Sequence, residues 1–249
     1  MSWTPTDSEA LYNLPNWGSG YFRINEAGNL TVRPDERKDE EVDLYELTGE
    51  ILRRGVRAPL LLRFDGILRD RVRRLTAAFD QARADSGYTA SYRAVYPIKV
   101  NQQRHVVEQL VGGGREHGLG LEVGSKPELL AAMGLGLDPG TPVICNGYKD
   151  AAYVEMALLA SQMGLDSIIV IEKFSELHTT LRAADELGIE PAIGVRMKPR
   201  IQGSGRWKDS GGDRSKFGLT TRQIVEAVKV LDQAGRLPCL KLLHFHIGS

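Results

Sequence analysis

The sequence predicts an α/β fold in which a parallel sheet closes as a (β/α)8 barrel of the TIM type, and three observations favour it. From residue 91 onward, short apolar segments alternate with amphipathic helical segments. The apolar segments lack polar alternation, which is typical of parallel strands covered on both faces. No early turn carries the Gly-x-Gly-x-x-Gly pattern expected of a doubly wound nucleotide fold, so a barrel is favoured over an open sheet.

The alternation predicts six strands joined by helices in right-handed crossovers. The strands are expected at residues 92–100, 119–123, 142–145, 167–171, 192–197 and 240–247, and the helices at 103–111, 127–133, 151–163, 175–187 and 222–234. A complete barrel of this type has eight strands. We therefore expect the chain to be a fragment whose barrel is truncated after about the sixth strand.

The region before the barrel is predicted to be an N-terminal extension over residues 1–90, with the incomplete barrel at 91–249. Residues 1–45 look irregular and polar, and residues 60–64 predict a short buried strand. Asp65 is expected to be the N-cap of an amphipathic helix that runs to about Arg83. We interpret the four arginines within 69–74 as the solvated face of this helix. The opposite face would carry Ile67, Leu68, Val72, Leu75 and Phe79.

Composition excludes several classes of function. The 249 residues include 32 basic and 32 acidic ones, so the net charge is zero. This balance argues against a nucleic-acid partner, which calls for a basic excess. The sequence shows neither a secretory signal nor a bilayer-spanning run. Cys145 and Cys239 lie in apolar runs and are interpreted as buried thiols in a reducing compartment. We expect a cytoplasmic protein without a membrane partner.

Lys99 is the first residue that could carry chemistry, because it lies near the end of an apolar strand. At a barrel mouth, partial desolvation would lower its pKa and make it a nucleophile toward carbonyl groups. Position alone still favours a lysine that reaches solvent or pairs with a carboxylate.

His244 and His246 alternate on the last strand, so they face the same side. They could bind a metal as in metal-dependent hydrolases, form a platform for a planar cofactor, or be hydrogen-bonded core histidines. Residues alone favour the core interpretation slightly. The following Gly248-Ser249 favours a phosphate or cofactor contact.

Three further charged residues stand near strand or helix ends. Glu122 and Arg196 lie inside apolar strands, so a mutual ion pair is as plausible as a functional role. Glu128 lies in the first turn of a helix, where interaction with the helix dipole would explain it. The polar loop at 202–213, closed by residues 215–219, is interpreted as a flexible lid, with a loop of no function as the alternative.

The segment Tyr96-Pro97-Ile98-Lys99-Val100-Asn101-Gln102 resembles the cofactor-lysine motif of the biosynthetic arginine decarboxylases. That family belongs to the alanine-racemase and ornithine-decarboxylase barrel class of pyridoxal-phosphate enzymes. The resemblance continues at Tyr12-Asn13, Trp17-Gly18, 60–64, 120–126, 143–150, 202–205, 215–219 and 244–249. The stretches 146–150 and 215–218 point to the arginine branch rather than to ornithine or diaminopimelate.

The resemblance implies a role for each matching residue. Lys99 would hold pyridoxal 5'-phosphate covalently, His246 would stack on its ring, and Ser249 would contact its phosphate. Glu122 would lie near this histidine and the ring, and Arg196 near the phenolic oxygen. The resemblance also places Glu128 at the cofactor site.

The activity implied is decarboxylation of L-arginine to agmatine and carbon dioxide, the first step of a route to putrescine and spermidine. Magnesium would be a further cofactor, and the full-length enzyme would be a homodimer or a larger homo-oligomer. In this family the acid for the pyridine nitrogen, the phosphate loop and the substrate-binding acids lie in later segments, so the fragment alone is expected to be inactive. Two alternatives remain: a metal-dependent barrel hydrolase that uses His244 and His246, and a barrel that binds the cofactor without catalysis.

Overall fold

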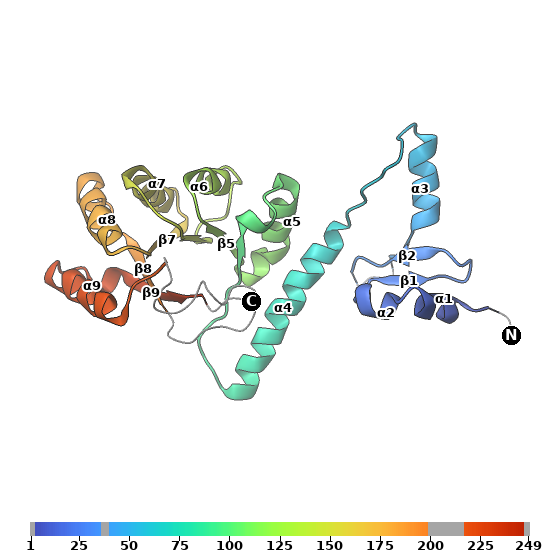
Figure 1. Ribbon diagram of the computed structural model, residues 1–249, viewed down its shortest axis with the longest axis horizontal. Coiled ribbons are helices and arrows are strands. Elements are labelled where there is room, and N and C mark those ends of the chain that lie inside the picture. Colours follow the sequence, from blue (N-terminus) through green and yellow to red (C-terminus); the bar gives the residue numbers. More distant parts are fainter. Residues whose placement is uncertain (1–2, 36–39, 199–216, 247–249) are drawn as a thin grey trace. The chain divides into compact units, whose positions relative to one another are not determined.

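The computed structural model describes residues 3–35, 40–198 and 217–246. The chain forms two compact units: the first runs to Tyr92 and includes Gly112–Gly114, and the second comprises Arg93–Val111 and the chain from Arg115 onward. The second unit contains the parallel sheet (Figure 1).

The sheet of the second unit has six parallel strands whose spatial order follows the sequence. The strands are β4 (Val95–Pro97), β5 (Gly120–Val123), β6 (Pro142–Cys145), β7 (Asp166–Ile171), β8 (Ala192–Met197) and β9 (Leu240–Phe245). A doubly wound sheet would reverse its winding direction at one strand. Sequential order without such a reversal is the winding of a barrel, which confirms the predicted fold class as a partial barrel.

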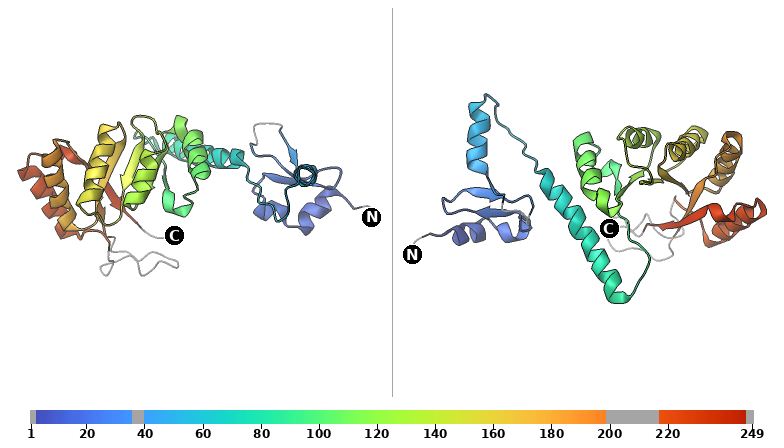
Figure 2. Two further views of the ribbon diagram at one scale, coloured as in Figure 1. Left: turned by 90° about the horizontal axis from the view of Figure 1, so that it is seen from above. Right: turned by 180° about the vertical axis from the view of Figure 1, so that it is seen from behind.

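The connecting helices lie along one outer side of the curved sheet (Figures 1 and 2). They are α5 (Arg104–Gly114), α6 (Lys126–Met133), α7 (Ala151–Gln162), α8 (Phe174–Leu187) and α9 (Thr221–Gln233). The core of this unit lies between them and the strands, where Leu121, Val143 and Ile193 are fully buried. Successive strand residues point to opposite faces, so Glu122 and Arg196 lie on the other, inner face of the sheet.

The predicted barrel elements are all present, with shifts of a few residues at their ends. The strands at 142–145 and 192–197 match in both bounds. The first strand is shorter than the predicted 92–100, because the chain enters the 3-10 turn η1 (Ile98–Val100) directly after Pro97. Proline cannot donate a hydrogen bond to a strand ladder, which accounts for the early end of the strand.

The prediction of an irregular segment at 1–45 is wrong. It contains α1 (Pro5–Leu11), α2 (Leu14–Trp17) and an antiparallel sheet of β1 (Phe22–Ile24), β2 (Leu30–Val32) and β3 (Val42–Asp43), followed by α3 (Leu44–Arg53). The start of α1 has a clear sequence signal, since Thr4 and Asp7 form a capping box and Pro5 between them opens the helix.

The predicted strand at 60–64 is also wrong. These residues pair with no strand in the described structure, and Leu61 is 74% exposed. The helix that follows, α4 (Asp65–Ser86), has Phe64 rather than Asp65 at its N-cap, and no side chain caps it. The helix ends at Gly87, whose φ of 66° is readily accessible to glycine.

The arginine-rich turn of α4 is not simply a solvated face. Asp70 is buried, forms ion pairs with Arg73 and Arg74, and accepts a 2.7 Å hydrogen bond from the Tyr21 hydroxyl. Burial, and then the Asp70 carboxylate, raises the pKa of Tyr21 to about 12. The opposite face is less buried than predicted.

Leu75 and Phe79, two residues of that opposite face, are 48% and 45% exposed. The ring of Phe79 stacks on Tyr92 with 3.9 Å between centroids.

The two cysteines, Cys145 and Cys239, are free and buried, as predicted. No helix in the described ranges combines the length and the apolar character required to cross a bilayer.

Candidate functional site

Lys99 lies in η1, immediately beyond the carboxyl end of β4. Buried Ile98 anchors this turn, and the Tyr96 hydroxyl donates to the Asn101 carbonyl at 3.3 Å. The Lys99 side chain is exposed rather than partly desolvated as expected. Its position at the end of a barrel strand is the one predicted, and its amine is accessible to a ligand.

Glu122 and Asn146 form a buried pair at the carboxyl ends of β5 and β6. Both residues are 8% exposed, and Asn146 Nδ2 donates to Glu122 Oε1 at 2.9 Å. Glu122 Oε2 and Asn146 Oδ1 have no hydrogen-bond partner within the described structure. Two buried acceptor oxygens are therefore available to a ligand that donates hydrogen bonds.

Glu128 acts on the start of its own helix. Its Oε2 accepts a 2.7 Å hydrogen bond from the backbone N–H of Gly124, two residues before α6. This arrangement is the helix-terminal role that the residue position favours. It also fixes the turn that follows β5, directly after Glu122.

Arg196 pairs with a carboxylate that the sequence analysis did not single out. Its Nη1 lies 2.9 Å from Oε1 of Glu172, which follows β7 and is 2% exposed. The alternative of a Glu122–Arg196 ion pair is therefore wrong. Glu172 follows β7, which is the direct neighbour of the strand β8 that carries Arg196. Glu122 lies on β5, and two strands separate β5 from β8. Glu172 Oε1 also accepts a hydrogen bond from the Gly147 N–H at 3.0 Å.

Lys149 and Glu176 lock the turns that follow β6 and β7. Glu176 accepts hydrogen bonds from the backbone N–H of Lys149 at 3.0 Å and of Glu172 at 2.9 Å. The Lys149 ammonium lies 3.3 Å from Glu176 Oε2, with side-chain exposures of 0% and 3%, and it also donates to the Gly147 carbonyl. Burial lowers the pKa of Lys149, and the Glu176 carboxylate opposes this shift.

Gly147 lies between these groups in a conformation that requires glycine. Its φ is 76°, and a side chain there would collide with the Gly124 carbonyl. The turn can therefore approach β5 closely and direct its N–H toward Glu172.

His244 and His246 lie at the end of β9. His244 is in register with Arg196 on the neighbouring strand, and its buried Nδ1 has no hydrogen-bond partner within the described structure. Burial, assisted by the Arg196 charge, lowers the pKa of His244 to about 4, so its ring is neutral at pH 7. His246 is exposed. Gly248 and Ser249 lie outside the described residues.

The segment 217–219 returns to the same end of the sheet. The Leu219 N–H donates to the Arg196 carbonyl at 2.7 Å, and the Gly218 N–H donates to the Glu172 carbonyl at 3.2 Å. The Phe217 ring lies 5.3 Å from the Tyr148 ring, and the Lys173 ammonium lies 3.5 Å above Tyr148. The predicted lid at 202–213 and residues 215 and 216 lie outside the described structure.

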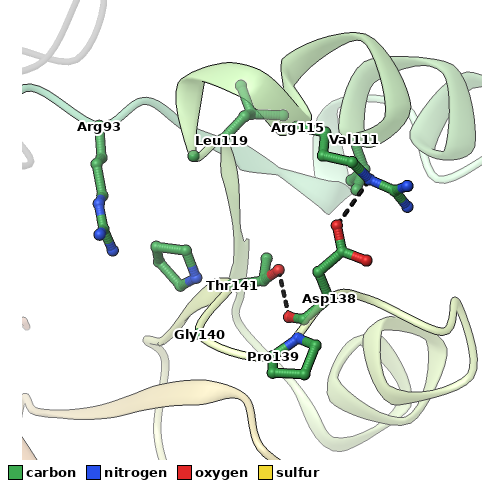
Figure 3. Close-up of a pocket in the computed structure, with 10 residues that line it drawn as sticks. Arg93, Val111, Arg115, Leu119, Asp138, Pro139, Gly140 and Thr141 are labelled. Carbon is green, nitrogen blue, oxygen red and sulfur yellow. Dashed lines mark hydrogen bonds and ion pairs between the residues drawn. The ribbon is translucent and has the colours of Figure 1, made fainter.

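A cavity of about 260 Å³ lies at the opposite, amino ends of β4 to β6 (Figure 3). It is lined by Arg93, Val111, Arg115, Gly118, Leu119, Asp138, Pro139, Gly140, Thr141 and Pro142. Arg115 and Asp138 form an ion pair of 2.7 Å at its edge (Figure 3). In barrels of this type the ends that bind ligands are the carboxyl ends, so this cavity is separate from the candidate site.

Comparison with known families identifies the family of this chain. Residues 69–249 match the family model described as the pyridoxal binding domain of the pyridoxal-dependent decarboxylases. The chain belongs to this family. Pyridoxal phosphate is the cofactor of such decarboxylases, and a lysine at the end of a barrel strand suits that cofactor because its amine can bond to an aldehyde.

Within the pyridoxal-dependent decarboxylases, the chain is similar to biosynthetic arginine decarboxylases. The chain is 52% identical over 248 residues to the biosynthetic arginine decarboxylase of Thermosynechococcus vestitus, and 51% identical over 249 residues to that of Gloeobacter violaceus. These alignments cover 100% of this chain and 39% of each relative. The chain thus spans about two fifths of the length of these relatives.

Solved decarboxylase structures share the fold. The biosynthetic arginine decarboxylase of Campylobacter jejuni matches with a TM-score of 0.82 at 32% identity, over 95% of this chain and 38% of that one. A diaminopimelate decarboxylase from M. jannaschii matches with a TM-score of 0.65 at 20% identity, over 93% of this chain and 49% of that one. The second match supports the fold alone.

The residues present fit a polar cofactor at the carboxyl ends of the strands. Four buried polar atoms there lack a partner within the described structure: Glu122 Oε2, Asn146 Oδ1, Glu172 Oε2 and His244 Nδ1. Buried polar groups normally have hydrogen-bond partners, so this concentration marks a site for a ligand or ordered water. Lys99 lies at the same end of the sheet, beyond β4.

Sequence reasoning missed Asn146, Lys149, Glu172 and Glu176 as individual residues of this site. A signal for the last two was present. Glu172 follows directly after the apolar run 167–171, and Glu176 follows four residues later in the first turn of a helix. An acid at the end of a buried parallel strand has the same positional significance as Lys99.

Proposed function

We propose that the protein containing this chain is a pyridoxal-phosphate-dependent arginine decarboxylase that converts L-arginine into agmatine and carbon dioxide. One observation carries the proposal: Lys99 and a set of buried, unsatisfied polar groups lie at the carboxyl end of the partial barrel. The substrate is inferred from the names of relatives that are about half identical to this chain.

Lys99 would hold the cofactor through its side-chain amine. Its Nζ is available because the side chain is exposed, and the turn that carries it is anchored by buried Ile98. When bound, pyridoxal phosphate serves as an electron sink for the carbon that loses carbon dioxide. A lysine on a short turn suits this role better than one fixed by a buried ion pair, as Lys149 is.

His246 is assigned to the face of the cofactor ring, and Ser249 to the phosphate. His246 is exposed at the end of β9, so its ring is free to lie against a planar ligand. His244 lies two residues deeper on the same face, with its Nδ1 buried. This difference in depth favours His246 over His244 for stacking.

Glu122, Arg196 and Glu128 complete the proposed cofactor-binding set. Glu122 offers a buried carboxylate oxygen that has no partner within the described structure, and the family resemblance assigns it to the neighbourhood of His246 and the ring. Arg196 supplies a positive charge near the phenolic oxygen. Glu128 contributes by holding the Gly124 turn beside Glu122. These assignments follow the family resemblance, and the burial of Glu122 supports its assignment.

Further properties are proposed for the full-length protein. It would be a cytoplasmic homodimer or larger homo-oligomer that initiates a route to putrescine and spermidine, and two free thiols are consistent with a reducing compartment. We assign no role to magnesium, because the described residues contain no cluster of three or more His, Cys, Asp or Glu side chains that could bind it. Membership of the pyridoxal-dependent decarboxylase family disfavours the metal-dependent hydrolase.

The direct test is an assay of the full-length protein with pyridoxal phosphate and carboxyl-labelled L-arginine. We expect labelled carbon dioxide and an equal amount of agmatine, with much slower release from ornithine, lysine and diaminopimelate. Cofactor absorbance near the visible edge without release from any amino acid would identify the non-catalytic alternative. Faster release from another amino acid would refute the arginine assignment while retaining the decarboxylase class.

A further inference from the structure

Glu172 is a buried carboxylate held in one orientation by its surroundings. Burial of a carboxylate is unfavourable unless the group is paired and hydrogen-bonded. Glu172 Oε1 meets both conditions, because it accepts from Arg196 Nη1 at 2.9 Å and from the Gly147 N–H at 3.0 Å. Its side chain is 1% exposed, so water does not compete for the charge.

The backbone of Glu172 is fixed as firmly as its side chain. Its N–H donates to Glu176 Oε2 at 2.9 Å, and its carbonyl accepts from the Gly218 N–H at 3.2 Å. Glu172 therefore links three chain segments at the carboxyl end of the sheet: the turn after β6, its own turn after β7, and the segment 217–219. A group restrained at so many points can act as a rigid support for a neighbour.

Arg196 is the neighbour that needs such a support. An arginine side chain has many rotamers, and ordering it is entropically unfavourable unless a partner fixes the guanidinium. Here Glu172 binds Nη1, and the Phe217 ring lies 5.4 Å from the guanidinium carbon. The side chain is 17% exposed. A guanidinium has five N–H donors, so donors other than the one bound by Glu172 can serve a ligand.

We propose that Glu172 is a positioning residue, which holds the Arg196 guanidinium in the orientation required to contact the cofactor. Glu172 acts on the cofactor through Arg196. This inference rests on the cofactor role assigned to Arg196 above, and it deepens that assignment by naming the group that makes the role possible.

The test is a double-mutant cycle on the full-length protein, read out as the dissociation constant of pyridoxal phosphate from absorbance titrations. The variants are Glu172→Gln, Arg196→Met and their combination. Glu172→Gln keeps the shape of the side chain and removes its charge. We expect it to weaken cofactor binding on the order of tenfold, and the combined variant to bind no more weakly than Arg196→Met alone. Asp138→Asn is the matched control, because it breaks an arginine ion pair of 2.7 Å at the opposite end of the sheet.

A second measurement separates positioning from a general loss of structure. At saturating cofactor, the absorption spectrum of the Glu172→Gln variant should shift in the same direction as that of Arg196→Met, whereas the control should keep the parent spectrum. If Glu172→Gln does not fold, Glu172→Asp replaces it in the cycle, because the shorter side chain draws the carboxylate away from the Arg196 guanidinium.

Additive losses in the combined variant, or unchanged binding and spectrum in the Glu172 variant, would overturn the proposal. Absence of turnover with arginine would count against the proposed substrate instead. The cycle measures cofactor binding and does not depend on that substrate.

Discussion

Lys99 combines an exposed side chain with a position on a short turn directly beyond the first strand of the barrel, β4. We expect Lys99→Ala in the full-length protein to abolish covalent attachment of the cofactor and nearly all decarboxylation. Borohydride reduction followed by peptide mapping measures the attachment. Lys126→Ala is the control, because Lys126 is another solvent-accessible lysine and is already paired with Asp150 at 2.6 Å. Reduced cofactor on a peptide without Lys99 would contradict the assignment.

The two histidines of β9 should respond differently to substitution because they lie at different depths. His246→Ala is expected to weaken cofactor affinity and slow decarboxylation, since an exposed ring at the strand end is lost. His244→Ala should mainly lower stability, because it removes a partly buried ring in register with Arg196. Cofactor titration and thermal unfolding of both variants measure the two effects. A His244 variant with the greater cofactor deficiency would reverse the roles.

His244 also predicts a pH dependence of stability. Burial and the Arg196 charge lower its folded-state pKa from 6.5 to about 4, so the unfolded chain binds the proton more tightly. The contribution of neutral His244 to stability is therefore complete above pH 6.5 and decreases as the pH falls toward 4. Urea unfolding of the parent and of His244→Gln across this range should show a smaller decrease in the variant. Equal decreases in the two proteins would show that groups other than His244 determine the pH dependence of stability in this range.

At the scale of elements, the buried ion pair between Lys149 and Glu176 connects the turns after β6 and β7. Removing one partner of a buried pair typically costs about 3–5 kcal/mol of unfolding free energy. We expect Lys149→Met to lower the free energy of unfolding by about 3 kcal/mol, near the lower end of this range. The loss is limited because Glu176 still accepts hydrogen bonds from the backbone N–H groups of residue 149 and Glu172. Denaturant unfolding measures the loss.

The control for this prediction is Lys126→Met, which breaks a pair whose side chains are 42% and 61% exposed. Exposed pairs contribute about 0–1 kcal/mol. Equal losses in the two variants would show that the burial of Lys149 has no special energetic importance.

The barrel elements were predictable because each depends on local periodicity. An apolar run such as 167–171 and an amphipathic stretch such as 175–187 indicate a strand and a helix without reference to the rest of the chain. The first unit lacked this signal. Its strands have only three, three and two residues, too few to show alternation. The run at 60–64 was misleading, since an apolar segment forms a strand only where a partner strand exists.

The candidate site was predictable only in part for the same reason. Lys99 and His246 occur in continuous motifs, which a sequence displays directly. The partner of Arg196 depends on which strand end lies beside β8, and on the register between the strands. That information belongs to the sheet, so the sequence analysis offered Glu122 as one possible partner of Arg196 and missed Glu172.

At the scale of the whole molecule, the described sheet has open edges at β4 and β9. On β9, Leu243 and Phe245 are 55% and 54% exposed. Unpaired parallel edges offer backbone donors and acceptors to other chains, and exposed apolar side chains contribute roughly 25 cal/mol per Å² to association. Relatives of more than twice this length contain further chain that can cover such surfaces.

We therefore expect the 249 residues expressed alone to be a poor catalyst. An open sheet admits water to the inner face, where Glu122 and Arg196 need a low-dielectric environment to act strongly on a ligand. The family resemblance also places the acid for the pyridine nitrogen and the substrate-binding acids in later segments. Agmatine formation at saturating cofactor, compared between this chain and the full-length protein, is the measurement. Turnover within about tenfold, a difference of only about 1.4 kcal/mol in activation free energy, would show that the essential groups lie within these residues.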